Sequence, residues 1–153
     1  MKLVPVLAAA LLLPLACALS AHAQDKGPWR ASTSDAKSIT GDIGIGGSRL
    51  TLNFSGFDIA EIRAITPAEA VAAFDADPGT PGGGNLYRLN IPAKQKFAHN
   101  NTLCGSDDTQ WMATWASGSD LHVAFFSGPK MPTFTIDALA NSGTLCGTFS
   151  YVR

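Results

Sequence analysis

Two cysteines lie in copies of the same four-residue motif, and they carry the clearest chemistry of the sequence. "TLCG" occurs at residues 102–105 and again at 144–147. A zinc site would need more ligands at short spacing, and a redox pair usually has C-x-x-C spacing. The residues after the two copies do not resemble one another, which speaks against an internal duplication. We therefore predict a disulfide between Cys104 and Cys146.

Outside the first 23 residues the sequence has two histidines, His99 and His122, so a histidine mechanism must use one of them. His122 lies in "LHVAFF" and could act as a general base with a nearby Ser or Asp, which makes a small hydrolase one interpretation. Hydroxyl and carboxylate side chains are common, however, and no G-x-S-x-G motif is present. We favour a strand histidine without a catalytic role and assign no catalytic residue.

Acidic pairs and a run of glycines could bind ions or phosphate, but both have simpler explanations. Asp107-Asp108 and Asp75-x-Asp77 lack the D-x-[DN]-x-[DN]-G pattern of a calcium loop, and aspartate is common in turns. The glycines at 82–84 lack the Lys-Ser/Thr ending of a phosphate-binding loop. The sequence therefore predicts no metal site and no cofactor.

Aromatic residues are the remaining candidates for function. They could line a cavity in the mouth of a barrel, where such folds hold apolar ligands, or they could fill the core. "TQWMATW" and "LHVAFF" carry bulky groups on both faces, which is more than a one-sided sheet needs. The candidate ligand-binding residues are Tyr87, Trp111, Trp115, His122 and Phe126.

The surplus of aromatic residues, together with the lack of a catalytic constellation, favours one interpretation. The protein would be a non-enzymatic domain that binds a small apolar ligand or a protein partner such as an extracellular hydrolase. The alternatives are the small hydrolase that uses His122 and a structural accessory protein of the cell envelope without a ligand. The sequence does not identify the ligand or the partner.

The first 23 residues have the order of a secretory signal peptide: Lys2, an apolar run to Leu19, and small residues at positions 21 and 23. We predict cleavage after Ala23 and a periplasmic or secreted protein, in a compartment where disulfides form. Attachment of a lipid at Cys17 is the alternative. The apolar run is shorter than the roughly 20 residues of a membrane span, and no longer run follows. We expect no transmembrane segment.

The charges speak against nucleic acid or an anionic membrane as partner. The 11 Lys and Arg residues less Lys2 leave 10, against 12 Asp and Glu, for a net charge of −2. The cations are dispersed along the sequence, whereas either partner calls for a clustered basic surface.

Short alternating segments separated by turn residues indicate a β-rich fold. Residues 24–28 are expected to be a loose lead-in, and "DPGTPGGG" at 77–84 predicts a flexible surface loop. A short helix is predicted at 66–74, where Thr66, a proline and Glu69 give the start of a capped helix. Strands are predicted at 37–45, 49–54, 57–65, 85–91, 109–115, 121–126, 145–152 and, as a strand or irregular edge, at 133–139.

Residues 24–153 are therefore expected to form a single β-rich domain. Its architecture would be an antiparallel barrel or sandwich of about seven or eight short strands with one short helix. Alternation directs one face of each strand toward the core. The residues predicted to face the core include Leu50, Leu52, Phe54, Tyr87, Leu89 and Ile91.

The C-terminal half also resembles a known group of proteins. "NLYRL", "NTLCG", "LHVAFFSG" and "LCGTFSYVR" are similar to segments of a family of small exported bacterial proteins without an assigned function. The resemblance extends from residue 85 to the C-terminus. It implies export and a paired cysteine, and it implies no activity.

Overall fold

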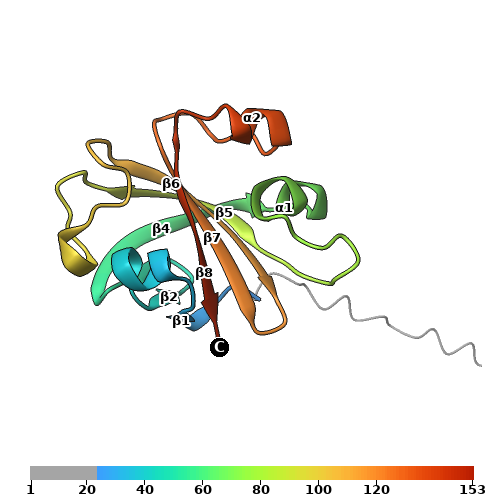
Figure 1. Ribbon diagram of the computed structural model, residues 1–153, viewed down its shortest axis with the longest axis horizontal. Helices are drawn as coiled ribbons and strands as arrows, with labels where there is room; N and C mark the ends of the chain where they lie inside the picture. Colours follow the sequence, from blue (N-terminus) through green and yellow to red (C-terminus); the bar gives the residue numbers. More distant parts are fainter. Residues whose placement is uncertain (1–23) are drawn as a thin grey trace, which may run out of the picture.

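A computed structural model describes residues 24–153. The predicted signal peptide and the alternative lipid site at Cys17 lie outside these residues. The described residues form a closed antiparallel barrel whose eight strands follow one another around the barrel in chain order (Figure 1). The predicted β fold class is confirmed, and of the two predicted architectures the protein adopts the barrel.

Each strand pairs with its neighbours in sequence, and β8 closes the barrel by pairing with β1. The strands are β1 (Gly27–Ala31), β2 (Ile43–Ile45), β3 (Arg49–Leu52), β4 (Ser55–Ala64), β5 (Asn85–Ile91), β6 (Thr109–Ser117), β7 (Asp120–Ser127) and β8 (Leu145–Val152). The helices are η1 (Ala36–Thr40), α1 (Pro67–Phe74), η2 (Ala98–Asn100) and α2 (Ile136–Ala140). The predicted strands that correspond to β4 through β8 are confirmed.

The β5–β7 part of the barrel buries side chains on both of its faces. The inner face contributes to a core that fills the barrel, where Tyr87, Met112 and Phe125 are fully buried. The outer face is covered by α1 and α2, which lie on the same side of the barrel (Figure 1). Trp115 and Phe126 are buried there. This second core accounts for the bulky residues on both faces of β6 and β7.

The helix predicted at 66–74 is confirmed, together with its capping box. Thr66 Oγ1 accepts a hydrogen bond from the amide N–H of Glu69 at 3.3 Å, and the Glu69 carboxylate accepts one from the amide N–H of Thr66 at 2.9 Å. Two bonds from the Arg63 guanidinium, at 2.7 and 2.8 Å, lower the pKa of Glu69. The carboxylate that completes the cap is therefore charged at neutral pH.

The strand predicted at 37–45 is wrong in its first half. Ala36–Thr40 forms a π-helical turn, and only β2 is extended. The Thr40 hydroxyl donates to the carbonyl oxygen of Ala36 at 3.1 Å and lies 2.6 Å from the hydroxyl of Tyr151. Ala36 is fully buried. A side-chain hydrogen bond and core packing hold this turn, and neither is visible in the alternation of the sequence.

The segment 133–139, predicted as a strand or irregular edge, instead contains most of α2. Thr135 caps this helix, because its Oγ1 accepts a hydrogen bond from the amide N–H of Ala138 at 3.2 Å. The preceding residue, Phe134, packs on Phe126 with ring centroids 5.7 Å apart. The cap and the outer core together favour a helical turn over a strand here.

The last two glycines of the loop at 77–84 contact β6. Gly83 bridges to Ala116 of β6 through hydrogen bonds of 2.9 and 2.8 Å. A Cβ atom at Gly84 would lie only 1.8 Å from the carbonyl oxygen of Thr114. Glycine is therefore needed at position 84, because the two backbones pack closely there. The end of the loop is anchored to β6.

The predicted disulfide between Cys104 and Cys146 is present. Cys104 precedes β6 and Cys146 is the second residue of β8. Since β6 and β8 run in the same direction, the bond lies at the end of the barrel where both strands begin. Both half-cystines pack against the barrel core. The bond ties the β5–β6 connection to the strand that closes the barrel.

The turn between β3 and β4 holds a phenylalanine in solvent. Phe54 is 100% exposed, so the prediction that it faces the core is wrong. Leu52 pairs with Ser55, which leaves Asn53 and Phe54 as a two-residue turn with φ angles of 44° and 67°. Hairpin turns of this kind need positive φ at both central residues, a conformation that is unfavourable for a residue with a Cβ atom.

Replacing Phe54 with Gly should give a protein about 1 kcal/mol more stable than replacing it with Ala. Both variants lose the phenyl ring, and only alanine keeps the Cβ atom in the left-handed region. Urea unfolding of the two variants measures the difference. An alanine variant as stable as the glycine variant would contradict this account of the turn.

Candidate functional site

The candidate site lies on the outside of the barrel, at the seam between β1 and β8. The first half of β1 pairs with β2, and two residues of its second half, Arg30 and Ala31, pair with β8. This short pairing leaves a groove of about 640 Å³. We call it the seam groove, and its lining residues are 26–30, Asp42, Ile43, Val152 and Arg153. Figure 1 shows the C-terminus beside β1 at this seam.

Trp29 is a buried residue of the seam groove, and Arg153 covers it. The indole N–H donates to the carbonyl oxygen of Asp25 at 3.0 Å. The Arg153 guanidinium stacks 3.9 Å from the centre of the indole ring. It also donates to the carbonyl oxygens of Gln24, at 3.0 Å, and Lys26. Arg153 therefore holds the segment before β1 against the barrel.

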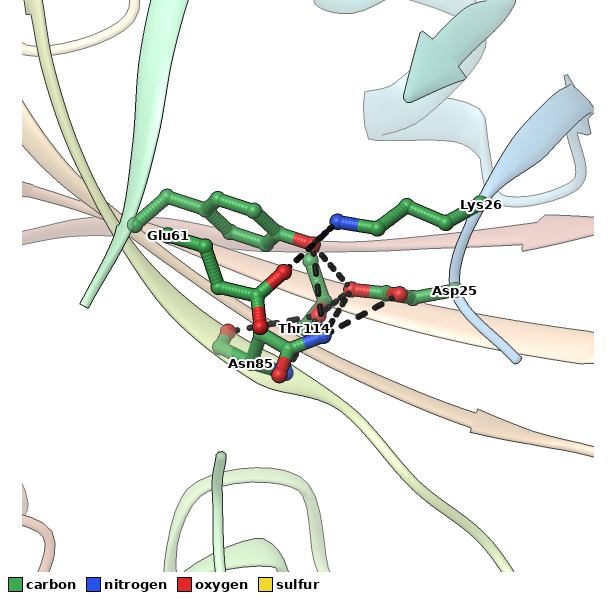
Figure 2. A network of polar contacts seen from close by, with 6 residues as sticks. Asp25, Lys26, Glu61, Asn85 and Thr114 are labelled. Atoms are coloured by element: carbon green, nitrogen blue, oxygen red, sulfur yellow. Dashed lines mark hydrogen bonds and ion pairs between the residues drawn. The ribbon is translucent and has the colours of Figure 1, made fainter. Parts of the chain in front are cut away.

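Next to Trp29, the side chain of Asp25 is fully buried in a polar network (Figure 2). Its carboxylate accepts hydrogen bonds from the hydroxyls of Thr114 at 2.6 Å and Tyr87 at 2.7 Å. The side-chain amide of Asn85 lies 3.2 Å from each carboxylate oxygen and donates to them. Burial, and next the bond to Asp25, raise the pKa of Tyr87, so this hydroxyl is a neutral donor. We call Asp25, Asn85, Tyr87 and Thr114 the Asp25 network.

Lys26 connects the Asp25 network to the surface. Its ammonium donates to the Glu61 carboxylate at 3.0 Å and to the Tyr87 hydroxyl, and it lies 4.6 Å from the centre of the Tyr87 ring. Figure 2 shows Lys26, from the segment before β1, and Glu61, from β4, approaching the network. The positive charge of Lys26 is thus already paired with Glu61, and Nη2 of Arg153 already donates to two backbone carbonyl oxygens.

The structure divides the predicted ligand-binding residues between the two faces of the barrel wall. Trp111, Trp115 and Phe126 lie together in the outer core beneath α1 and α2. Tyr87 lies inside the barrel, in the Asp25 network. His122 lies half-buried beside α1. The structure brings three of these residues together and leaves Tyr87 apart from them, and their role in ligand binding stays a prediction.

His122 faces Ser150 across β7 and β8. Its Nδ1 atom lies 3.0 Å from the Ser150 hydroxyl oxygen, and the ring of Phe74 stacks on the imidazole at 6.0 Å. Partial burial lowers the pKa of His122, opposed by the charge of Asp120, so the ring is neutral at neutral pH. A neutral imidazole beside a hydroxyl could act as a base. Within residues 24–153, however, no carboxylate is hydrogen-bonded to His122.

Other classes of site find little support in the part of the chain that the structure describes. Within residues 24–153, no group of three or more His, Cys, Asp or Glu side chains is placed to hold a metal ion. None of the helices formed by these residues has the length and apolar character that crossing a bilayer requires.

Sequence analysis missed the Asp25 network, which lies next to the seam groove. The segment 24–28 was expected to be loose, whereas Asp25 is fully buried. Its partners Asn85 and Thr114 are 60 and 89 residues away in sequence. No local pattern connects residues that far apart. The available signal is the order of "DKGPW", where an acid and a cation directly precede the first strand.

The comparisons with known proteins add no relative. A scan against protein-family models gave no match, and searches of curated proteins and of solved structures gave none either. The resemblance to a family of exported bacterial proteins stays untested. A function for this chain therefore rests on its own residues and their geometry.

Proposed function

We propose that this protein is an exported, non-enzymatic domain that binds a small, partly apolar ligand in the seam groove. The observation that carries the proposal is the groove itself, which has a mostly apolar lining and a volume of about 640 Å³. That volume falls within the range of small-molecule sites. The barrel interior, in contrast, is filled by side chains. A ligand that leaves the barrel intact would bind on its outside.

The groove offers apolar surface that a ligand can reach. Pro28 is exposed and Val152 is half-buried, and both line the groove. The methylene stems of Arg30 and Arg153 extend this surface, since long cationic side chains lay their apolar part along a protein while the charge stays in water.

The groove also sits on a rigid frame. The Asp25 network fixes the chain just before β1, and the Cys104–Cys146 bond ties the opposite end of the barrel. A site that is already formed loses little conformational freedom when a ligand binds, which favours affinity. The disulfide also fits an exported protein, because such bonds persist in oxidising compartments.

Binding of N-phenyl-1-naphthylamine, a neutral apolar dye that fluoresces in apolar surroundings, tests the proposal. We expect saturable binding to the purified protein. Val152→Phe fills the groove and should weaken binding about tenfold. The matched control is Val71→Phe, the same change on α1 and away from the groove, which should leave binding unchanged.

Two outcomes would overturn the proposal: no saturable dye binding, or equal loss in both phenylalanine variants. If Val152→Phe does not fold, amide NMR shifts of the unaltered protein decide the question. On addition of dye they should move at residues 26, 27, 29, 30, 42, 43, 152 and 153, and shifts elsewhere would place the dye at another site.

Hydrolysis by His122 is the second candidate function, favoured by the 3.0 Å contact between its Nδ1 atom and the Ser150 hydroxyl. His122→Ala separates the two candidates. Any ester hydrolysis by the unaltered protein must disappear in this variant if His122 is the base, whereas dye binding in the seam groove should be unaffected.

A further inference from the structure

A second hollow continues the seam groove along β1. It has a volume of about 580 Å³ and shares Arg30, Asp42 and Val152 with the groove. Beyond these shared residues it is lined by Ser32 and by Lys37 of η1, among others. Because the two hollows have lining residues in common, they lie next to each other, and we call the pair the trough. The trough joins an apolar end to a polar end.

The two ends of the trough differ in charge. At the groove end, Lys26 is paired with Glu61, and Arg153 donates to backbone carbonyl oxygens. At the other end, Arg30 and Lys37 are exposed. Within residues 24–153 neither side chain forms an ion pair, a hydrogen bond or a cation–π contact.

One carboxylate, that of Asp42, lies in the walls of both hollows. Its Oδ1 atom accepts the amide N–H of Ala31 at 2.9 Å, so a backbone group already uses part of its acceptor capacity. The two positive charges of Arg30 and Lys37 outnumber the single negative charge of Asp42. The polar end of the trough therefore carries a surplus of positive charge in a molecule that is negative as a whole.

From this arrangement we infer that the ligand of the trough is a small amphipathic anion. Its carboxylate or phosphate head binds between Arg30 and Lys37, and its apolar body lies over Pro28 and Val152. The inference rests on the proposed function, because it assigns the ligand class of the same site. Charge-assisted bonds to the head supply orientation, and burial of the apolar body supplies most of the affinity.

A small ligand fits these residues better than a larger anionic partner. Nucleic acid and anionic membranes bind to broad clusters of Lys and Arg. Of the four cations around this trough, Lys26 is paired with Glu61 and Arg153 is bound to backbone carbonyl oxygens, which leaves two side chains at the polar end for a ligand. The apolar end adjoins them directly, through the shared residues Arg30 and Val152. The pattern matches a molecule with one charged head and one apolar body.

Competition with the bound dye tests the ligand class. Laurate, below its micelle concentration, and 1-dodecanol have chains of the same length and differ in the charged head. We expect laurate to displace the dye at concentrations about tenfold lower than dodecanol. In the double variant Arg30→Gln/Lys37→Gln this advantage should disappear, so that laurate and dodecanol displace the dye at concentrations within about twofold of each other.

The double variant Arg49→Gln/Lys96→Gln removes the same types of charge at exposed positions outside the trough. It should keep the full advantage of laurate. Equal displacement by laurate and dodecanol, or equal effects of the two double variants, would overturn the inference while leaving the proposed function intact. Failure of the dye itself to bind would overturn the proposed function and the inference with it.

Vesicles separate a free anion from a lipid surface. Phosphatidylcholine vesicles with and without phosphatidylglycerol should not sediment the protein at physiological salt. Sedimentation that needs phosphatidylglycerol and is lost in Arg30→Gln/Lys37→Gln would overturn the small-ligand assignment in favour of an anionic membrane.

Discussion

Replacing Asp25 with Ala should lower the free energy of unfolding by about 3 kcal/mol. The carboxylate is fully buried and accepts hydrogen bonds from Thr114, Tyr87 and Asn85. Without it these buried donors lose their acceptor, and each unpaired group carries the cost of its removal from water. Among residues 24–153, Asn85 Oδ1 is already buried without a hydrogen-bond partner, and the substitution would add further unpaired groups beside it.

Chemical denaturation at neutral pH measures the loss, and Asp58→Ala is the control. Asp58 also carries a negative charge and bonds a cation, Arg49, at 3.1 Å, but its side chain is 93% exposed. Its removal should change stability by less than about 0.5 kcal/mol. If Asp25→Ala costs no more than Asp58→Ala, the Asp25 network does not anchor the segment before β1.

The strands β5, β6 and β7 were predictable because they are short segments rich in aromatic and other apolar residues between turn residues. Both faces of these strands are buried, so a shift by one residue would exchange the contents of two cores. The helix at α1 was predictable for a different reason. Its start is set by hydrogen bonds between residues three positions apart, Thr66 and Glu69. Such local bonds can be recognised from the spacing of the two residue types in the sequence.

The errors fall where tertiary contacts or turn geometry override a local pattern. Phe54 continues the alternation of β3, but it lies in the hairpin turn between β3 and β4. Thr40 continues an alternating run, but its hydroxyl forms hydrogen bonds with the carbonyl oxygen of Ala36 and the hydroxyl of Tyr151. At Gly84 the composition predicts only a loop, and it does not reveal the close contact with Thr114 that leaves no space for a Cβ atom. In each case the deciding partner is a residue or a turn that alternation does not encode.

The candidate site was hidden for the same reason. The cations appear dispersed along the sequence, yet Lys26, Arg30, Lys37 and Arg153 meet around one trough in the folded protein. Barrel closure produces this clustering, since it places the end of β8 beside β1. A charge pattern of this kind becomes visible only when the first and last strands are known to pair.

Reduction of the Cys104–Cys146 bond should destabilise the protein by about 4 kcal/mol, the largest effect expected here. The estimate follows from the sequence separation of 42 residues, because a closed loop of this length removes much conformational freedom from the unfolded chain. For a domain of this size the loss corresponds to a fall in Tm of about 15 °C.

Thermal unfolding followed by circular dichroism, with and without a thiol reductant, measures this fall. The double variant Cys104→Ala/Cys146→Ala is the control, since it should melt near the reduced protein and show no response to the reductant. A Tm that is the same in oxidised and reduced protein would mean that the unfolded loop is restricted by other contacts. The loop contains β6 and β7, which pair as neighbours along almost their whole length. Any hairpin that persists between them in the unfolded state would shorten the free loop, so the measured loss also reports how much of this hairpin survives unfolding.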